Sequence, residues 1–253
     1  MTVHELYQKL SEKIPRELSC AWDNDGLMCC PKGEAEARRV LVTLDVTEAA
    51  VQAAKDGGYD LIVSHHPMIF KGVKAVNEEN YIAAKTIDLI LNGISVMSFH
   101  TRLDAVKGGV NDVLSKLLGI HDVVPFGEEA IGRIGTLSEE MSAEVFAKKV
   151  KSVLDAPVVL LSDAGRPVRR VAVLGGGGDD DVFAAQAAGA DTYVTGELKY
   201  HSLIDAPEVG INLIEAGHFH TENPVCETLR EWLVTIDPSL TVDLFCSYAI
   251  RTV

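Results

Sequence analysis

The chain has 253 residues, of which 47% are hydrophobic, and its formal net charge at pH 7 is −14. This length predicts one large domain or two compact lobes, with enough apolar side chains for a true core. The negative charge opposes binding to nucleic-acid phosphates, so a nucleic acid is not an expected partner. No apolar run reaches the length of a membrane span, and residues 1–5 lack the features of a signal peptide. We therefore expect a soluble, cytoplasmic protein with no membrane contact.

The cysteines argue against two common kinds of small scaffold. There are five, an odd number, and none forms a C-x-x-C pair. Disulfide frameworks and structural zinc ribbons are therefore not expected. The adjacent pair Cys29-Cys30 is compatible with a soft metal site or a redox pair, but we favour reduced thiols that pack as small hydrophobic side chains. On this interpretation the cysteines are dispensable for metal binding.

The first half of the chain alternates between helical and strand patterns. Thr2-x-x-Glu5 is a capping-box pattern and predicts a helix to about Ile14. Later residues predict a strand over 39–45, a helix over 47–54 closed by glycines 57 and 58, and a buried strand from 61 to 64. This order is a βαβ unit, which implies parallel strands. A helix over 81–91, a strand over 94–99 and a helix reaching 118 follow.

The second half repeats the first. Arg38-Arg39-Val40, Gly58-Tyr59-Asp60 and Ser64 match Arg169-Arg170-Val171, Gly189-Ala190-Asp191 and Thr195, all at one offset of 131 residues. Gly93-Ile94 then matches Gly210-Ile211 at an offset of 117. Chance resemblance between βαβ units is the alternative, but the constant offset favours duplication. We therefore predict an α/β protein with two similar α/β lobes in a pseudo-two-fold arrangement, residues 1–125 and 126–253, with the final strand able to pack on the first lobe.

One stretch combines a buried strand with potential metal ligands. The apolar residues 61–63 lead directly into Ser64-His65-His66-Pro67. Ligands bind at the carboxyl ends of strands in open α/β sheets, and neutral imidazole is the commonest metal ligand. Adjacent histidines on an extended backbone point to opposite sides, so this pair suits two neighbouring metals better than one. The alternative is a pair of loop histidines that bind nothing.

Three more predicted strands end in polar side chains. The strand over 94–99 leads into His100 and Asp104, the strand before residue 197 ends in Glu197, and the strand before residue 216 leads into His218 and Glu222. Imidazoles and carboxylates without thiolates suit zinc, manganese, iron or nickel. The glycine run 175–178 is followed by three aspartates, which would repel an anion, so a tight turn is favoured over close approach to a ligand.

These motifs together resemble one family over nearly the whole chain. They are Ser64-His65-His66-Pro67, His100-Thr101-Arg102-Leu103-Asp104, Gly109-Val110-Asn111, Thr195-Gly196-Glu197, Gly217-His218 with Thr221-Glu222, and the loop Trp22-Asp23-Asn24. They resemble the NIF-three-like family, whose bacterial members are often labelled GTP cyclohydrolase I type 2 homologues. The resemblance implies a dinuclear metal site in the cleft between the two lobes, a toroidal homohexamer, and a short form without an inserted domain. It implies the ligands His65, His66, Asp104, His218 and Glu222, with Glu222 bridging two divalent ions.

Two functions of different classes follow from this resemblance. In the first, the protein is a dinuclear metal-dependent hydrolase of the GTP cyclohydrolase kind. A metal-bound hydroxide would attack a C–N bond of a small-molecule substrate such as a purine nucleotide. His100 would then be a donor beside the metals or a proton shuttle, with a purely structural histidine as its alternative. In the second, the protein is a non-enzymatic metal-binding or regulatory hexameric assembly. An open coordination position favours the first and a closed one the second.

Overall fold

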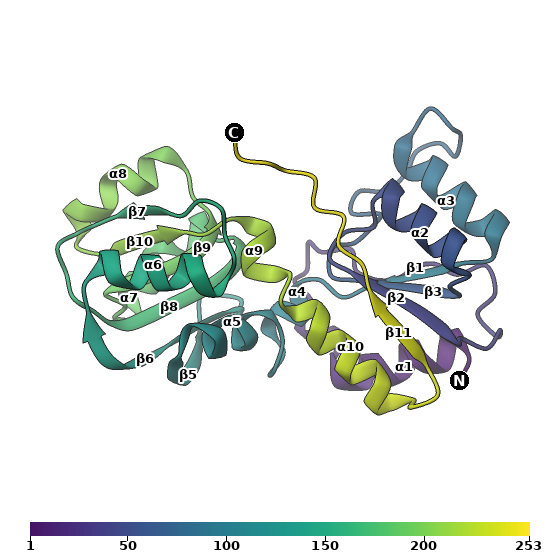
Figure 1. Ribbon diagram of the computed structural model, residues 1–253, viewed down its shortest axis with the longest axis horizontal. Coiled ribbons are helices and arrows are strands. Elements are labelled where there is room, and N and C mark those ends of the chain that lie inside the picture. The colour runs from purple at the N-terminus through teal and green to yellow at the C-terminus, as the bar shows by residue number, and fades with distance from the viewer. The chain divides into compact units, whose positions relative to one another are not determined.

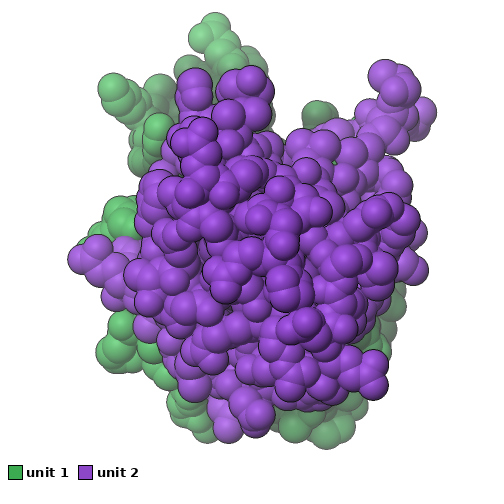
Figure 2. Space-filling model, turned by 90° about the vertical axis from the view of Figure 1, so that its left-hand side faces the viewer, with its two compact units in different colours: residues 1–103, 226–249 green, residues 104–225, 250–253 purple.

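The computed structural model describes residues 1–253, which form two compact units, each with its own sheet (Figure 1). Unit 1 comprises residues 1–103 and 226–249, and unit 2 comprises residues 104–225 and 250–253 (Figure 2). The expected α/β class is confirmed in its coarser form, because both units mix helices with strands. None of the helices combines the length and the apolar composition needed to cross a bilayer.

Unit 1 contains a five-stranded sheet in the order β1-β4-β3-β2-β11. The strands β4, β3, β2 and β11 run parallel, and β1 pairs with β4 in the antiparallel sense. The elements of this unit are α1 (Val3–Lys13), η1 (Arg16–Leu18), β1 (Gly26–Cys29), β2 (Arg39–Thr43), α2 (Glu48–Gly57), β3 (Leu61–Ser64), α3 (Tyr81–Asn92), β4 (Ser95–Ser98), the first residues of α4 (Thr101–Ala105), most of α10 (Val225–Ile236) and β11 (Thr241–Leu244).

Local sequence signals explain where the helices of unit 1 begin and end. Thr2 accepts a hydrogen bond from the backbone N–H of Glu5, and the Glu5 side chain accepts one in return, so the predicted capping box is confirmed. Helix α2 is capped by Thr47 and ends at Gly58, whose φ of 64° favours glycine. Buried side chains of α2 and α3 pack with alternate residues of β2, β3 and β4, so these two helices cover one face of the sheet.

Unit 2 contains a six-stranded sheet in the order β5-β6-β8-β9-β10-β7. Its central strands β8, β9 and β10 are parallel, and the outer strands β5, β6 and β7 are antiparallel to their neighbours. The elements are α5 (Val110–Leu118), β5 (Ile120–Phe126), β6 (Gly132–Met141), α6 (Ala143–Val153), β7 (Leu160–Ser162), β8 (Val168–Gly177), η2 (Asp179–Asp181), α7 (Val182–Ala187), β9 (Thr192–Glu197), α8 (Tyr200–Val209), β10 (Asn212–Glu215) and α9 (His218–Glu222).

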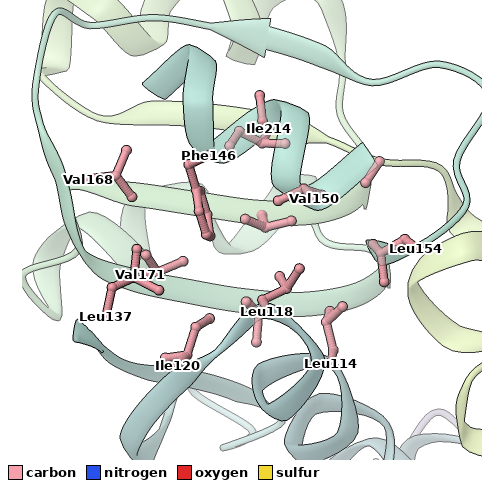
Figure 3. Close-up of a cluster of buried hydrophobic side chains, with 14 of the residues drawn as sticks. Leu114, Leu118, Ile120, Leu137, Phe146, Val150, Leu154, Val168, Val171 and Ile214 are labelled. Carbon is pink, nitrogen blue, oxygen red and sulfur yellow. The ribbon is translucent and has the colours of Figure 1, made fainter. Parts of the chain in front are cut away.

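The core of unit 2 has two layers, one on each face of the sheet. On one face, Phe146 and Val150 of α6 and Leu114 of α5 meet Val171 of β8 (Figure 3). On the other face, Ala172 packs in a second buried cluster with residues of α7 and α8. Neighbouring residues of β8 thus point into opposite layers, as strand geometry requires. Helices on both faces leave the strand ends as the place where polar side chains gather.

The repeat found in the sequence is present in the hydrogen bonds of the two sheets. In unit 1, one carboxylate oxygen of Asp60 accepts from the backbone N–H groups of Arg38 and Arg39, at 2.8 and 2.9 Å. In unit 2, Asp191 accepts in the same way from Arg169 and Arg170, at 2.9 and 2.6 Å. The strands also pair in the same register, Thr43 with Ser64 and Leu174 with Thr195. The three parallel strands and the helices between them are therefore built twice.

Candidate metal-binding residues

Two imidazoles follow the end of β3. The backbone N–H of His66 donates to Leu44 O, which ties this segment to the chain after β2. The Nδ1 atom of His65, a buried residue, donates to the carbonyl oxygen of Phe99 at 2.9 Å. The Nδ1 atom of His66 donates to the carboxylate of Asp45 at 2.7 Å. In the neutral rings the lone pair is then on Nε2, which is the nitrogen available to a metal.

A third imidazole, His100, is oriented in the same way. Its Nδ1 atom lies 2.8 Å from Oδ1 of Asp23. The other oxygen of Asp23 accepts from the backbone N–H and the hydroxyl of Thr101, at 3.1 and 2.7 Å. Burial raises the pKa of Asp23, but the hydrogen bonds and the charge of His100 and the hydrogen bonds from Thr101 outweigh it and lower the pKa to about 2. Asp23 is therefore an anion that holds the ring of His100.

These three histidines form one group within unit 1. One ring nitrogen of each lies within 4.8 Å of one ring nitrogen of the others. The ring centroids of His65 and His66 are 4.9 Å apart, so the expectation that the two side chains point to opposite sides is wrong. The reason is that β3 ends at Ser64, and the chain bends at both histidines. Three neighbouring imidazoles, each with Nδ1 donating to an oxygen, fit a divalent transition-metal ion.

A second group of candidate metal ligands lies on and beside α9 in unit 2. His218 and Glu222 are one helical turn apart, and Nε2 of His218 lies 3.0 Å from Oε2 of Glu222. Two ligands of one ion at roughly 2.0–2.2 Å can adopt this separation. The Nδ1 atom of His218 lies 3.2 Å from the carboxylate of Glu197, at the end of β9. The predicted proximity of His218 and Glu222 is confirmed.

Asp104 belongs to the same part of unit 2. One carboxylate oxygen of Asp104 lies within 4.8 Å of one oxygen of Glu222, and both residues are buried. The side chain of Asn111 connects the backbone of Asp104 with that of Gly175. Its amide nitrogen donates to Asp104 O at 3.3 Å, and its amide oxygen accepts from Gly175 N at 2.8 Å. Two buried carboxylates at this separation repel each other, and a cation relieves that repulsion. The pair therefore also fits a metal ion.

The glycine run 175–178 has a different role from the predicted tight turn. Gly175–Gly177 form the end of β8, and this strand end passes against α9. A Cβ atom on Gly176 would lie 2.1 Å from Oε1 of Glu222, and one on Gly196 would lie 2.5 Å from Gly176 O. Glycine is required because backbone and carboxylate share this space. The group that approaches the glycine backbone is the side chain of Glu222, whereas the alternative considered from the sequence was a bound ligand.

The structure also shows which polar residues the sequence analysis missed. Asp45 and Asp23 orient His66 and His100, but neither was identified as a candidate. Their positions in the chain could have identified them, because Asp45 follows a parallel strand and Asp23 lies in the turn-forming loop after Trp22. The exposed His201 on α8 contacts the ring of Tyr200 and belongs to neither group. No cysteine belongs to either group.

The comparison with protein families covers almost the whole chain. Residues 1–250 match the model of the Duf34/NIF3 family, named for NGG1p interacting factor 3. The chain belongs to this family. A protein from Clostridium perfringens named GTP cyclohydrolase 1 type 2 homolog is 34% identical over 238 residues, which cover 91% of this chain and 90% of that protein. A protein of the same name from Methanocaldococcus jannaschii is 29% identical and covers 92% of this chain and 95% of its own length.

Solved structures of family members support the fold. A Bacillus cereus protein related to NIF3 matches with a TM-score of 0.85 at 25% identity, covering 99% of this chain and 97% of that chain. The protein ybgI, described as of unknown function, matches with a TM-score of 0.89 at 26% identity, covering 98% and 99%. The family resemblance stated from the motifs is therefore confirmed.

Proposed function

We propose that the protein is a metal-dependent hydrolase that binds two divalent ions through His65, His66, Asp104, His218 and Glu222. The observation that carries this proposal is the orientation of His65 and His66, which each donate Nδ1–H to an oxygen acceptor and so keep Nε2 for a metal, with His100 held in the same way beside them. Such contacts fix the ring tautomer and raise the basicity of Nε2.

The two groups would contribute different ligands for the two ions. His65 and His66 would bind through Nε2, and the Asp45 carboxylate would strengthen the second of these bonds. His218 would supply a third imidazole. Asp104 and Glu222 would supply the anionic oxygens that balance the charge of the ions, and Glu222 lies close to both His218 and Asp104. Zinc, manganese, iron and nickel all suit this donor set.

When bound, the ions would act as Lewis acids and lower the pKa of a water molecule to about 7. Hydrolysis of a C–N bond puts the oxygen of water on carbon and a proton on nitrogen. We assign the movement of that proton to Nε2 of His100, whose ring is held by the anionic Asp23 at 2.8 Å. The substrate class we propose is a purine nucleotide, because relatives with this fold carry the name GTP cyclohydrolase 1 type 2 homolog.

The first test is metal content. Protein purified without chelator should contain two ions per chain by elemental analysis, and one ion or none after reloading would contradict the proposal.

Glu222→Gln and Asp104→Asn should lower both metal content and turnover. His100→Ala should lower turnover while the metals remain. His201→Ala, on the exposed surface of α8, is the matched histidine control. A double Cys29→Ala/Cys30→Ala variant should keep its metals.

The second test is activity. The substrate panel begins with GTP and related purine nucleotides and continues with simple phosphoesters. A folded Glu222→Gln variant stripped of metal that hydrolysed a substrate as fast as the parent would overturn the metal-dependent mechanism. If metal-loaded parent acted on nothing in the panel, the non-enzymatic metal-binding or regulatory assembly would be the better description.

We also propose that the protein assembles as a homohexamer. Helix α3 presents Tyr81 and Leu91, which are 73% and 78% exposed and line the same hollow on one side of the helix. Apolar side chains gathered on one helix are typical of a protein–protein contact surface. Light scattering in dilute buffer should give a mass near six times the chain mass of 27.3 kDa. A mass near that of one chain would refute the assembly.

A further inference from the structure

Two exposed aromatic rings lie beside His100 in unit 1. Trp22 is 58% exposed and Phe70 is 43% exposed. Their ring centroids are 6.3 Å apart with an interplanar angle of 75°. Each ring also meets His100 edge to face, Trp22 at 6.2 Å and Phe70 at 6.0 Å. The three rings therefore form one cluster that is open to solvent on the side of the two large aromatics.

Hydrogen bonds hold both rings in place. The residue after Trp22 is Asp23, whose carboxylate is anchored by His100 and by two donors of Thr101. The residue before Phe70 is Ile69, whose carbonyl oxygen accepts from the side-chain amide of Asn24 at 2.5 Å. The loop that carries Trp22 and the loop that carries Phe70 are thus tied to each other and to the start of α4. Little side-chain freedom remains to be lost on binding.

Edge-to-face contacts within the cluster use only part of each ring. Exposed faces of tryptophan and phenylalanine are apolar, and burying them against a flat partner releases water. Stacking on aromatic side chains is how proteins bind nucleobases without reading their sequence. An ordered aromatic pair next to a candidate proton-transfer histidine therefore has the properties of a binding surface for a planar ring.

We propose that Trp22 and Phe70 form the subsite on which the purine ring of the substrate stacks, so that this ring lies beside His100. The inference rests on the proposed function for the class of substrate, but it concerns residues that are not metal ligands. Both aromatics are specificity determinants: they select a planar ring over the sugar and phosphate parts of the nucleotide.

The fluorescence of Trp22 offers a direct measurement. The chain has two tryptophans, and Trp232 lies on α10 under the ammonium of Lys13. A Trp232→Phe protein keeps Trp22 as its single tryptophan. In stopped-flow mixing before turnover, GTP should quench this fluorescence, whereas inorganic triphosphate should not. Equal responses to the two probes would overturn the subsite.

Substitutions then test whether stacking supplies affinity. Base–aromatic stacking is worth about 1–3 kcal/mol per base, so Trp22→Ala should weaken GTP binding roughly 5- to 150-fold in equilibrium dialysis. Phe70→Ala should weaken it less, because its ring is more covered. Trp22→Phe should restore most of the loss. Phe183→Ala, on α7 of unit 2 and 64% exposed, is the control and should bind like the parent.

The outcomes separate this inference from the proposed function. Relative to the parent, the Trp22→Ala variant should show a larger rise in KM for GTP than fall in kcat. It should still hold two metals. A folded, metal-loaded Trp22→Ala protein that binds GTP like the parent would overturn the subsite and leave the hydrolase intact. Trp22-dependent GTP binding in a parent that holds no metal would support the subsite while the metal-dependent function fails.

Discussion

The strand ends of the two units are built alike and carry different chemistry. In unit 1, Phe99 N donates to Ser64 O, and in unit 2, Ala216 N donates to Thr195 O, both at 2.9 Å. The residues that follow these matched positions differ: His65 and His66 in unit 1, Gly196 and Glu197 in unit 2. The same backbone thus presents two imidazoles in one unit and a single carboxylate in the other.

Packing against the neighbouring strand explains the difference. Counted from the matched residues of β2 and β8, Asp45 in unit 1 takes the place of Gly176 in unit 2. Asp45 supports the ring of His66, whereas Gly176 leaves room for the carboxylate of Glu222. A side chain at Gly196 would strike the backbone of both Gly176 and His218. The comparison teaches that the repeat keeps the hydrogen bonds within the sheet, while the residues just beyond the strands carry the chemistry.

The largest effect should come from giving Gly196 of unit 2 the Cβ atom that the matched His65 has in unit 1. In Gly196→Ala, the Cβ atom would lie 2.5 Å from Gly176 O and 2.7 Å from His218 Cα, which are backbone atoms. Overpacking of this kind costs about 3 kcal/mol where the backbone must move. Urea unfolding followed by circular dichroism measures the loss. Gly72→Ala is the control, because nothing lies within 4 Å of its added Cβ; equal stability of the two variants would contradict this account of the difference.

The next effect concerns the carboxylates that orient histidines in each unit. Asp45 contacts His66 at 2.7 Å and Glu197 contacts His218 at 3.2 Å. Asp45→Ala should lower metal affinity about 10- to 100-fold, the usual cost of losing such a partner. Glu197→Ala should cost less, because its contact is longer and its side chain is 64% exposed. Competition with a chromophoric chelator gives both affinities, and a larger loss for Glu197→Ala would reverse the comparison.

Much of this scaffold could be predicted from the sequence. The strand predicted over 39–45 is β2, the helix predicted over 47–54 is the first part of α2, and the capping box of α1 is present. These elements carry strong local signals: apolar periodicity, Ser or Thr caps and closing glycines. The offset of 131 residues also predicts that Asp191 is the counterpart of Asp60. The equivalent hydrogen bonds that the two side chains accept from backbone N–H groups confirm this.

The remaining features depend on contacts that the sequence does not encode locally. The strands β1 and β11 are short and only partly buried, and their partners are far away in the chain. The convergence of His65 and His66 was missed because the backbone was assumed to stay extended at both histidines, whereas the chain bends there. The roles of Asp23 and Asp45 follow from loops that meet only after folding. The long strand β6 and the glycine contacts of α9 were hidden for the same reason.

A smaller effect should separate the two carboxylates that the repeat shares. Asp191 is buried and Asp60 is partly exposed, although each accepts two backbone N–H groups. Leaving buried donors unsatisfied costs about 1–3 kcal/mol. The loss of stability in Asp191→Ala should therefore lie near the upper end of this range, and the loss in Asp60→Ala near the lower end. Asn at either position keeps an acceptor oxygen and should restore part of the loss. Urea midpoints in the reverse order would show that the two sites are not equivalent.

The smallest effect concerns charge, and it has opposite signs in the two units. The pKa of Asp23 in unit 1 falls to about 2, although burial opposes this, so the charged group stabilises the fold above its ordinary pKa of 3.8, and this contribution is lost as the pH falls through about 2. In unit 2, burial and the charges of Asp180 and Glu129 raise the pKa of Asp181 above 3.8. Its ionised form therefore costs the folded state stability at pH 7, and that cost disappears as the pH falls below 3.8.

Asp181→Asn should accordingly stabilise unit 2 at pH 7, by about 0.5 kcal/mol or less, as is usual for partly exposed positions. The gain should vanish in acid, where the parent side chain is neutral as well. Thermal unfolding at pH 7 and at about pH 3.5 measures the gain in stability and its disappearance in acid. Asp205→Asn is the control, because Asp205 is exposed on α8 and is not one of the charges that raise the pKa of Asp181, so its loss should not stabilise the fold. A gain for Asp181→Asn that persisted in acid would point to packing, because only the electrostatic cost depends on pH.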